Sequence, residues 1–178
     1  NLISELVKRD EKCLINNAAY LLNEENLGEC FKMLKRGKAA GIDGVSVEEY
    51  ELNLESNLKA LVEKMKAQAY KPLPARRTYI AKADGKMRPL GIPAVEDKIV
   101  QRGITRILEA IFEVEFLDYS YGFRPHKSCH QALKRLDEII MTKPINHIID
   151  ADIKGFFDHV DHEWMMKFLG HKISDSNF

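Results

Sequence analysis

Two aspartates separated by one residue lie at the end of an apolar run, and this spacing suggests a site for chemistry. Residues 145–153 are rich in Ile, which favours a strand, and the side chains of a strand alternate between its two faces. Asp150 and Asp152 would therefore point the same way at the carboxyl end of that strand. Carboxylates in this position suit a hard cation such as Mg²⁺, which prefers oxygen ligands.

Three kinds of chemistry use a carboxylate placed in this way. They are nucleotidyl transfer with two metal ions, Asp-x-Asp sugar-nucleotide transfer, and phosphoaspartyl phosphatase chemistry. The phosphatase pattern normally has Thr or Val two residues after the second aspartate, where this chain has Lys154. The spacing alone leaves the first two open, beside the structural alternative of strand-end aspartates that cap a turn.

A predicted hairpin carries the second group of candidate residues. Residues 77–82 and 86–92 read as two strands, and the Asp84-Gly85 pair between them is a strong hairpin signal. We therefore expect a hairpin over residues 77–92.

The length of the hairpin loop decides which cations share a face. A three-residue loop with Gly85 left-handed sets Lys82 opposite Lys86 and Ile80 opposite Arg88, so the three cations lie on one face. A two-residue loop would move Arg88 to the other face. If this hairpin holds phosphates, we predict the three-residue form.

Charge along the chain is uneven although its total is zero, with 27 basic and 27 acidic residues. Between Tyr70 and Arg106 nine basic residues stand against three acidic ones. The basic residues are Lys71, Arg76, Arg77, Lys82, Lys86, Arg88, Lys98, Arg102 and Arg106, and the acidic ones are Asp84, Glu96 and Asp97. A local excess of this kind suits a phosphate-binding surface, although a solvated face is the simpler alternative.

The remaining elements are predicted to be mostly helical. Apolar spacing and caps predict helices over residues 2–17, 26–36, 96–115, 128–141 and 163–169, with one more behind a Ser46–Glu49 capping box. Ser128 and Asp161 are the predicted N-caps of the last two. In the helix at 128–141 the residues expected to face inward are Ala132, Leu133, Leu136, Ile139 and Ile140. The order of helices, hairpin, helices and strand predicts an α+β fold.

The motif around Asp152 is similar to a known one. The run Asp-Ile-Lys-Gly-Phe-Phe-Asp at residues 152–158 resembles the first catalytic motif of group II intron reverse transcriptases. The resemblance implies that Asp152 binds Mg²⁺ with help from the main-chain carbonyl of Ile153. It also implies that the ring of Phe157 stacks under the sugar of the incoming nucleotide and excludes a 2′-hydroxyl. The alternative for Phe157 is a core aromatic.

Three upstream blocks resemble the same family in the same order. Residues 80–93 resemble its fingers hairpin, which implies that Lys82 and Arg88 hold the triphosphate of the incoming nucleotide. Residues 121–128 resemble its Gly-Phe-Arg-Pro block beside template and nucleotide, and the alternative for Arg124 is a structural salt bridge.

The third block is the loop Ala-Gly-Ile-Asp-Gly at residues 40–44. It resembles a loop of the family's N-terminal extension, a region associated with binding of template and intron RNA.

The resemblance implies a right-hand polymerase fold, with helical fingers and a β-hairpin joined to an incomplete ferredoxin-like palm. The expected divisions are an N-terminal extension at 1–45, fingers at 46–115, and fingers and palm at 116–178. The implied activity is Mg²⁺-dependent RNA-directed DNA polymerisation, with intron RNA, an RNA template, a DNA primer and deoxynucleoside triphosphates as partners. A homodimer is one assembly that the resemblance allows. Retron and diversity-generating reverse transcriptases share these motifs, and the resemblance to the N-terminal extension ranks them below the group II intron type.

The chain departs from the family at one essential point. No Tyr-x-Asp-Asp sequence occurs, so we expect this fragment to be inactive alone and its parent to be active. Asn rather than Met begins the chain, so a true N-terminus upstream is expected. The rival function is an RNA-binding splicing maturase without polymerase activity, and a sugar-nucleotide transferase is the more distant alternative.

The remaining features favour a ribonucleoprotein of the cytoplasm, bacterial or organellar. Three widely spaced cysteines indicate a reducing compartment rather than disulfides or a zinc site. The groups of polar residues near His126 and His159 lack the paired spacing of structural zinc sites. We therefore interpret them as polar residues at the starts of helices. No apolar run approaches the roughly 18 residues of a membrane span, so no membrane partner is expected.

Overall fold

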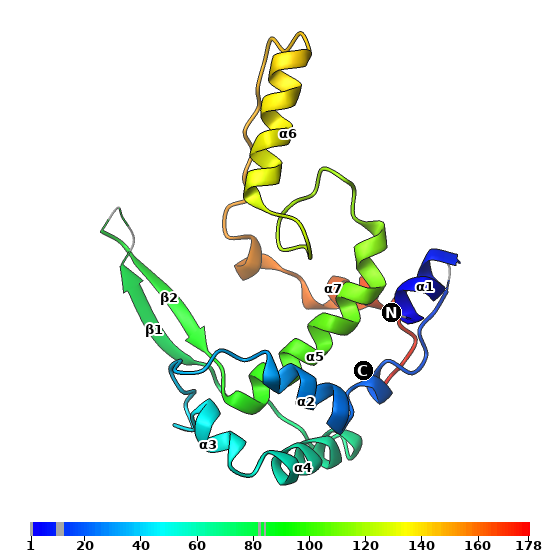
Figure 1. Cartoon of the computed structure of the whole chain (residues 1–178), viewed down its shortest axis with the longest axis vertical. Coiled ribbons are helices and arrows are strands. Elements are labelled where there is room, and N and C mark those ends of the chain that lie inside the picture. Colours follow the sequence, from blue (N-terminus) through cyan, green and yellow to red (C-terminus); the bar gives the residue numbers. More distant parts are fainter. Residues whose placement is uncertain (1, 10–12, 82, 84) are drawn as a thin grey trace. The chain divides into compact units, whose positions relative to one another are not determined.

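The computed structural model describes residues 2–9, 13–81, 83 and 85–178 (Figure 1). Its helices are α1 (Leu2–Arg9), α2 (Glu24–Lys32), α3 (Val47–Glu51), α4 (Leu54–Lys66), α5 (Val95–Phe112), α6 (Cys129–Thr142) and α7 (His162–Gly170); its strands are β1 (Arg76–Ala81) and β2 (Met87–Ile92); and short 3₁₀ turns are η1 (Ala19–Leu21), η2 (Glu113–Glu115) and η3 (Phe156–His159). The chain forms two compact units, one of residues 17–107 with 175–178 and one of residues 1–16 with 108–174. None of the helices described is long and apolar enough to cross a membrane.

The unit of residues 17–107 is built on α2, α4 and the first part of α5. Leu27, Leu61 and Ile99 come from these three helices and are fully buried. Gly103 packs closely against α2 and the residues before it, because an added Cβ would lie 2.8 Å from Leu22 Cδ2 and 3.1 Å from Leu27 Cδ2 of α2. The core thus depends on apolar side chains at helical spacing, as the sequence predicts.

Local signals set the starts of several helices. The capping box of Ser46 and Glu49 is present, with the Glu49 N–H donating to Ser46 Oγ at 3.1 Å. Ser128 accepts from the Gln131 N–H, and Asp161 accepts from the Trp164 N–H. These three predicted caps are confirmed.

The hairpin adopts the predicted register. Ile80 pairs with Arg88 and Ala81 with Met87, and Gly85 is left-handed with φ +78°. This is the pairing that a three-residue loop requires, and it places Arg88 on the same face as Ile80. Lys82 lies outside the described residues, so its predicted position stays a prediction.

The second unit contains α1, α6, α7 and the end of α5. Val7 of α1 and Ile111 of α5 are buried in it. A parallel bridge joins Ile15 to Ile173, with the Ile15 N–H donating to the Lys172 carbonyl at 2.8 Å. Lys172 also pairs with Glu115.

Several predicted helices have different bounds. The helix expected over 26–36 is α2 and ends at Lys32, and the helix expected behind the capping box is divided into α3 and α4. The helix expected over 2–17 is α1, and residues 13–17 are not helical because Ile15 pairs with the distant Ile173 instead. Residues 10–12 lie outside the described part of the chain. The helix expected over 96–115 begins at Val95 and turns into the 3₁₀ turn η2 after Phe112.

The strand expected at 145–153 does not form. Across the described residues the sheet has two strands, β1 and β2, so this segment has no neighbour to receive its backbone hydrogen bonds. Its side chains are exposed, Ile149 at 91%. On α6, Leu133, Leu136 and Ile140 are exposed rather than inward as predicted, with Leu133 at 63%, while Ala132 and Ile139 are half-buried. The segment keeps a strand-like composition without the partner that would make it a strand.

Candidate active site

Asp152 lies in an exposed, irregular segment of the second unit, as do Asp150 and Ile153. Gly155 then turns the backbone with φ +63° and begins η3. His159 Nδ1 lies 2.7 Å from the Gly155 carbonyl oxygen, and an added Cβ on Gly155 would lie 3.1 Å from the His159 ring. The turn that follows Asp152 therefore favours glycine both by its backbone angle and by this close contact.

Phe157 presents its ring to solvent from η3. The side chain is 83% exposed and lies edge-on to Phe156, with ring centroids 5.3 Å apart. An exposed aromatic ring close in sequence to Asp152 is available to a sugar or base. Within this unit Phe157 is not a core residue.

The described residues do not form a complete cation site. Among them, no group of three or more His, Cys, Asp or Glu side chains is arranged to hold a metal ion. The Asp152 carboxylate and the Ile153 carbonyl are oxygen donors of the type that a hard divalent cation prefers. Two such donors do not complete a site for two metal ions, so the chain by itself does not fit the catalytic metal pair.

Arg88 lies in β2 of the other unit and is exposed. Its pairing with Ile80 sets it on one face of the hairpin, while Arg77, which pairs with Gly91, lies on the opposite face. Both faces are open to solvent, since most residues of the two strands are exposed. The hairpin thus carries cations on two separate, accessible faces.

Arg124 is buried, with its side chain 7% exposed, and it organises the loop that carries it. Its Nε and Nη2 donate to the Glu113 carboxylate, the latter at 2.9 Å. Its Nη1 donates to the carbonyls of Leu117 at 2.8 Å and Ser120 at 2.9 Å. The guanidinium also lies 4.9 Å from the centroid of the Phe116 ring. In this structure the guanidinium makes the salt bridge that the sequence allowed as an alternative, while a contact with nucleotide stays a prediction.

Loss of the Arg124 counterion should destabilise this loop. We expect Glu113→Gln to lower the free energy of unfolding by about 2 kcal/mol, because it leaves a buried guanidinium without a paired charge; the value is reduced from that of a fully buried pair since Glu113 is 33% exposed. The matched control is Glu138→Gln, which breaks an exposed pair with Arg135 and should cost less than about 0.5 kcal/mol. Chemical denaturation measures both, and equal effects would contradict the buried role of Arg124.

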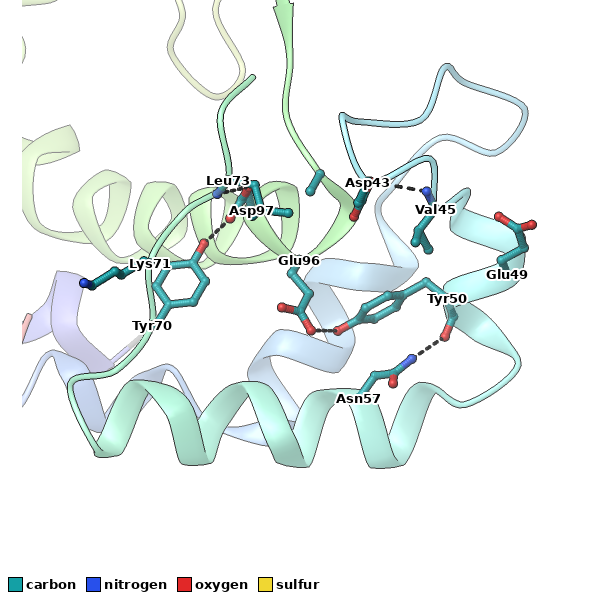
Figure 2. A pocket seen from close by; sticks show the side chains of 11 residues that line it. Asp43, Val45, Glu49, Tyr50, Asn57, Tyr70, Lys71, Leu73, Glu96 and Asp97 are labelled. Carbon is teal, nitrogen blue, oxygen red and sulfur yellow. Dashed lines mark hydrogen bonds between the residues drawn. The ribbon is translucent and has the colours of Figure 1, made fainter. Parts of the chain in front are cut away.

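A polar pocket of about 290 Å³ lies at the base of the hairpin and was not predicted from the sequence (Figure 2). Asp97 of α5 is 3% exposed, and it accepts hydrogen bonds from the Tyr70 hydroxyl and, at 3.1 Å, from the Leu73 N–H. Next to it, Glu96 accepts from the Tyr50 hydroxyl at 3.4 Å.

Burial, reinforced by these acidic neighbours, raises the pKa of both Tyr50 and Tyr70 far above its usual value, so both hydroxyls stay protonated donors. One sequence signal could have identified Asp97. Asp97 is a carboxylate three residues before Val100, so helical spacing places it on an apolar stripe of α5.

Comparison with known proteins gives a family. Residues 80–174 match the reverse transcriptase (RNA-dependent DNA polymerase) family, a stretch that includes both Arg88 and Asp152. Protein YkfC of Escherichia coli K12 is 39% identical over 86% of this chain and 42% of its own length. The group II intron-encoded protein LtrA of Lactococcus lactis subsp. cremoris is 38% identical over 88% of this chain and 26% of its own.

A 91 kDa protein in the cob intron of Schizosaccharomyces pombe is 33% identical over 93% of this chain and 19% of its own length. The chain therefore spans less than half the length of these relatives. The family predicted from the motif around Asp152 is confirmed: this chain belongs to the reverse transcriptase (RNA-dependent DNA polymerase) family, which it shares with group II intron-encoded proteins.

Proposed function

We propose that this chain forms the fingers and the start of the palm in an RNA-directed DNA polymerase of the group II intron type. The observation that carries the proposal is the family match over residues 80–174, which includes strand β2 with Arg88 and the segment of Asp152 in one stretch. The reaction is extension of a DNA primer on an RNA template. The primer's 3′-hydroxyl attacks the α-phosphate of a deoxynucleoside triphosphate and pyrophosphate leaves.

The proposed division of labour follows the motifs. Asp152 and the Ile153 carbonyl would hold Mg²⁺ together with carboxylates that this sequence does not contain, so the chain alone is proposed to be inactive. Phe157 lies against the sugar of the nucleotide, and Arg124 shapes the loop beside it. The proposed organisation is a right-hand polymerase, with an extension at 1–45, fingers at 46–115, and fingers and a ferredoxin-like palm at 116–178. The proposed setting is a cytoplasmic or organellar ribonucleoprotein with intron RNA, and a homodimer is one assembly that this proposal allows.

Splicing is a second role of the same protein in this proposal. Relatives named as intron-encoded proteins and as a nuclear intron maturase support binding to intron RNA. The two roles differ in what they need. Polymerisation needs the Asp152 carboxylate, whereas RNA binding needs basic side chains, whose loss weakens affinity and flattens its salt dependence.

Substitutions in the hairpin test whether it binds the triphosphate of the nucleotide. In the full-length polymerase that contains this chain, we expect Arg88→Ala to raise the KM for deoxynucleoside triphosphates about tenfold, because a guanidinium makes paired charged hydrogen bonds to phosphate oxygens. Arg77→Ala is the matched control. It removes the same charge from the opposite face of the same hairpin and should change the KM less than about twofold.

Steady-state primer extension on an RNA template measures both variants. Equal effects of Arg88→Ala and Arg77→Ala would mean that the hairpin acts through its general charge and does not hold the triphosphate on one face. No effect of either would remove the hairpin from the nucleotide site.

A further inference from the structure

The hairpin of β1 and β2 is held mainly at its base. In the described part of the chain its two strands pair with each other and with no third strand. Ten of their twelve residues are exposed, and only Thr78 and Ile92 are half-buried. A two-stranded ribbon without a buried face has little packing of its own to set its direction. Its direction must therefore come from the chain segments that enter and leave it.

Asp97 joins those two segments. The chain enters β1 through residues 70–75, and it leaves β2 through residues 93 and 94 into α5, whose third residue is Asp97. The carboxylate accepts one hydrogen bond from the Tyr70 hydroxyl and another from the Leu73 N–H, both in the entering segment (Figure 2). One buried side chain on the leaving segment thus holds the entering segment at two points.

The helix start that carries Asp97 is itself fixed. Gly41 approaches it so closely that an added Cβ would lie 2.6 Å from Ala94 Cα. The neighbouring Glu96 pairs with Lys64 at 3.6 Å, and the Lys98 ammonium donates to the Ala39 carbonyl at 3.3 Å. Asp97 therefore joins the entering segment to a part of the unit that is anchored on several sides.

We infer that Asp97 is a positioning residue that sets the direction of the hairpin, and through it the place of Arg88 at the triphosphate. The inference rests on the proposed function for the role of Arg88. Asp97 acts through the backbone of residues 70–75 and contacts no nucleotide itself. A buried carboxylate with two donors suits this task, because each bond is charge-assisted and shielded from water.

The anchoring is tested first on this chain by amide hydrogen exchange. Tyr70→Phe removes one donor to Asp97 and keeps the ring, and we expect the protection of amides in residues 76–81 and 87–92 to fall about tenfold while α2 and α4 keep theirs. Tyr50→Phe is the matched control. It removes a tyrosine hydroxyl from the same pocket but breaks the bond to Glu96, and the hairpin amides should exchange as in the wild type.

The second readout is nucleotide kinetics in the full-length polymerase. We expect Asp97→Ala to raise the KM for deoxynucleoside triphosphates about tenfold with kcat changed less than about twofold. Asp97→Asn, which keeps an oxygen acceptor for the Leu73 N–H, should recover part of the loss. Tyr50→Phe should leave both constants unchanged.

The two readouts separate the inference from the function on which it rests. Unchanged hairpin exchange in Tyr70→Phe and Asp97→Ala would overturn the positioning role of Asp97. Faster exchange with an unchanged KM would support the anchoring and refute the triphosphate role of the hairpin. Faster exchange with a raised KM and partial recovery by Asp97→Asn supports both.

Discussion

Asp152→Asn is expected to reduce primer extension by the full-length polymerase at least about a thousandfold, while its affinity for intron RNA stays within about twofold of the wild type. The substitution keeps the size of the side chain and one oxygen but removes the negative charge that a divalent cation needs. RNA affinity depends on basic side chains elsewhere, so it should not follow the loss of synthesis. Primer extension on an RNA template and RNA binding at fixed salt measure the two effects.

Asp150→Asn is the matched control for this prediction. Asp150 lies two residues earlier in the same exposed, irregular segment, so the change in charge and local chemistry is the same. We expect it to slow extension by less than about tenfold, as for a residue near the site that holds no reacting group. Extension retained by Asp152→Asn would refute the catalytic role of Asp152. Tight RNA binding without extension in the wild type would instead indicate a maturase that has lost synthesis.

Gly41→Ala is expected to destabilise the unit of residues 17–107 by about 3 kcal/mol or more. An added Cβ would lie 2.6 Å from Ala94 Cα, 2.7 Å from Ala94 N and 3.0 Å from the Pro93 carbonyl carbon. All three are backbone atoms of the two residues just before α5, so no side chain can rotate away to relieve the overlap. Denaturant unfolding of the chain measures the loss of stability.

Gly28→Ala is the control, because it makes the same substitution where an added Cβ causes no steric overlap. Gly28 lies within α2, and an added Cβ would make an ordinary contact of 3.6 Å with Leu58 Cδ1. Because Ala is the better helix former, we expect this variant to be neutral or more stable by up to about 1 kcal/mol. If both variants unfold at the same denaturant concentration, the close approach of residues 40–44 to α5 does not contribute to stability.

Features that depend on a few neighbouring residues were predicted well from the sequence. The capping box of Ser46 and Glu49 and the cap at Ser128 formed as expected, because each joins groups three residues apart. The hairpin register also followed from a local cause. Gly85 alone can take the left-handed conformation cheaply, and it sets Ile80 opposite Arg88.

Features that depend on distant partners were predicted poorly. Residues 145–153 have a strand's composition, but a strand needs a neighbour, and the described residues offer none. The apolar face of α6 was expected to be buried, because an amphipathic helix usually packs its apolar face against the core. In the described chain, however, the Leu133 side chain is 63% exposed. The predicted helix over 2–17 was too long because Ile15 pairs with Ile173 from the other end of the chain.

The sequence by itself determined the family and the candidate residues Asp152, Arg88 and Phe157, because the motifs that carry them are short and contiguous. Only the tertiary structure decided which groups two buried charged side chains contact. It showed the Arg124 guanidinium paired with Glu113, and it revealed Asp97 as the carboxylate that joins both ends of the hairpin. The physical reason is that a buried charge must find its partners in space, and spatial neighbours from separate segments leave no fixed spacing in a sequence.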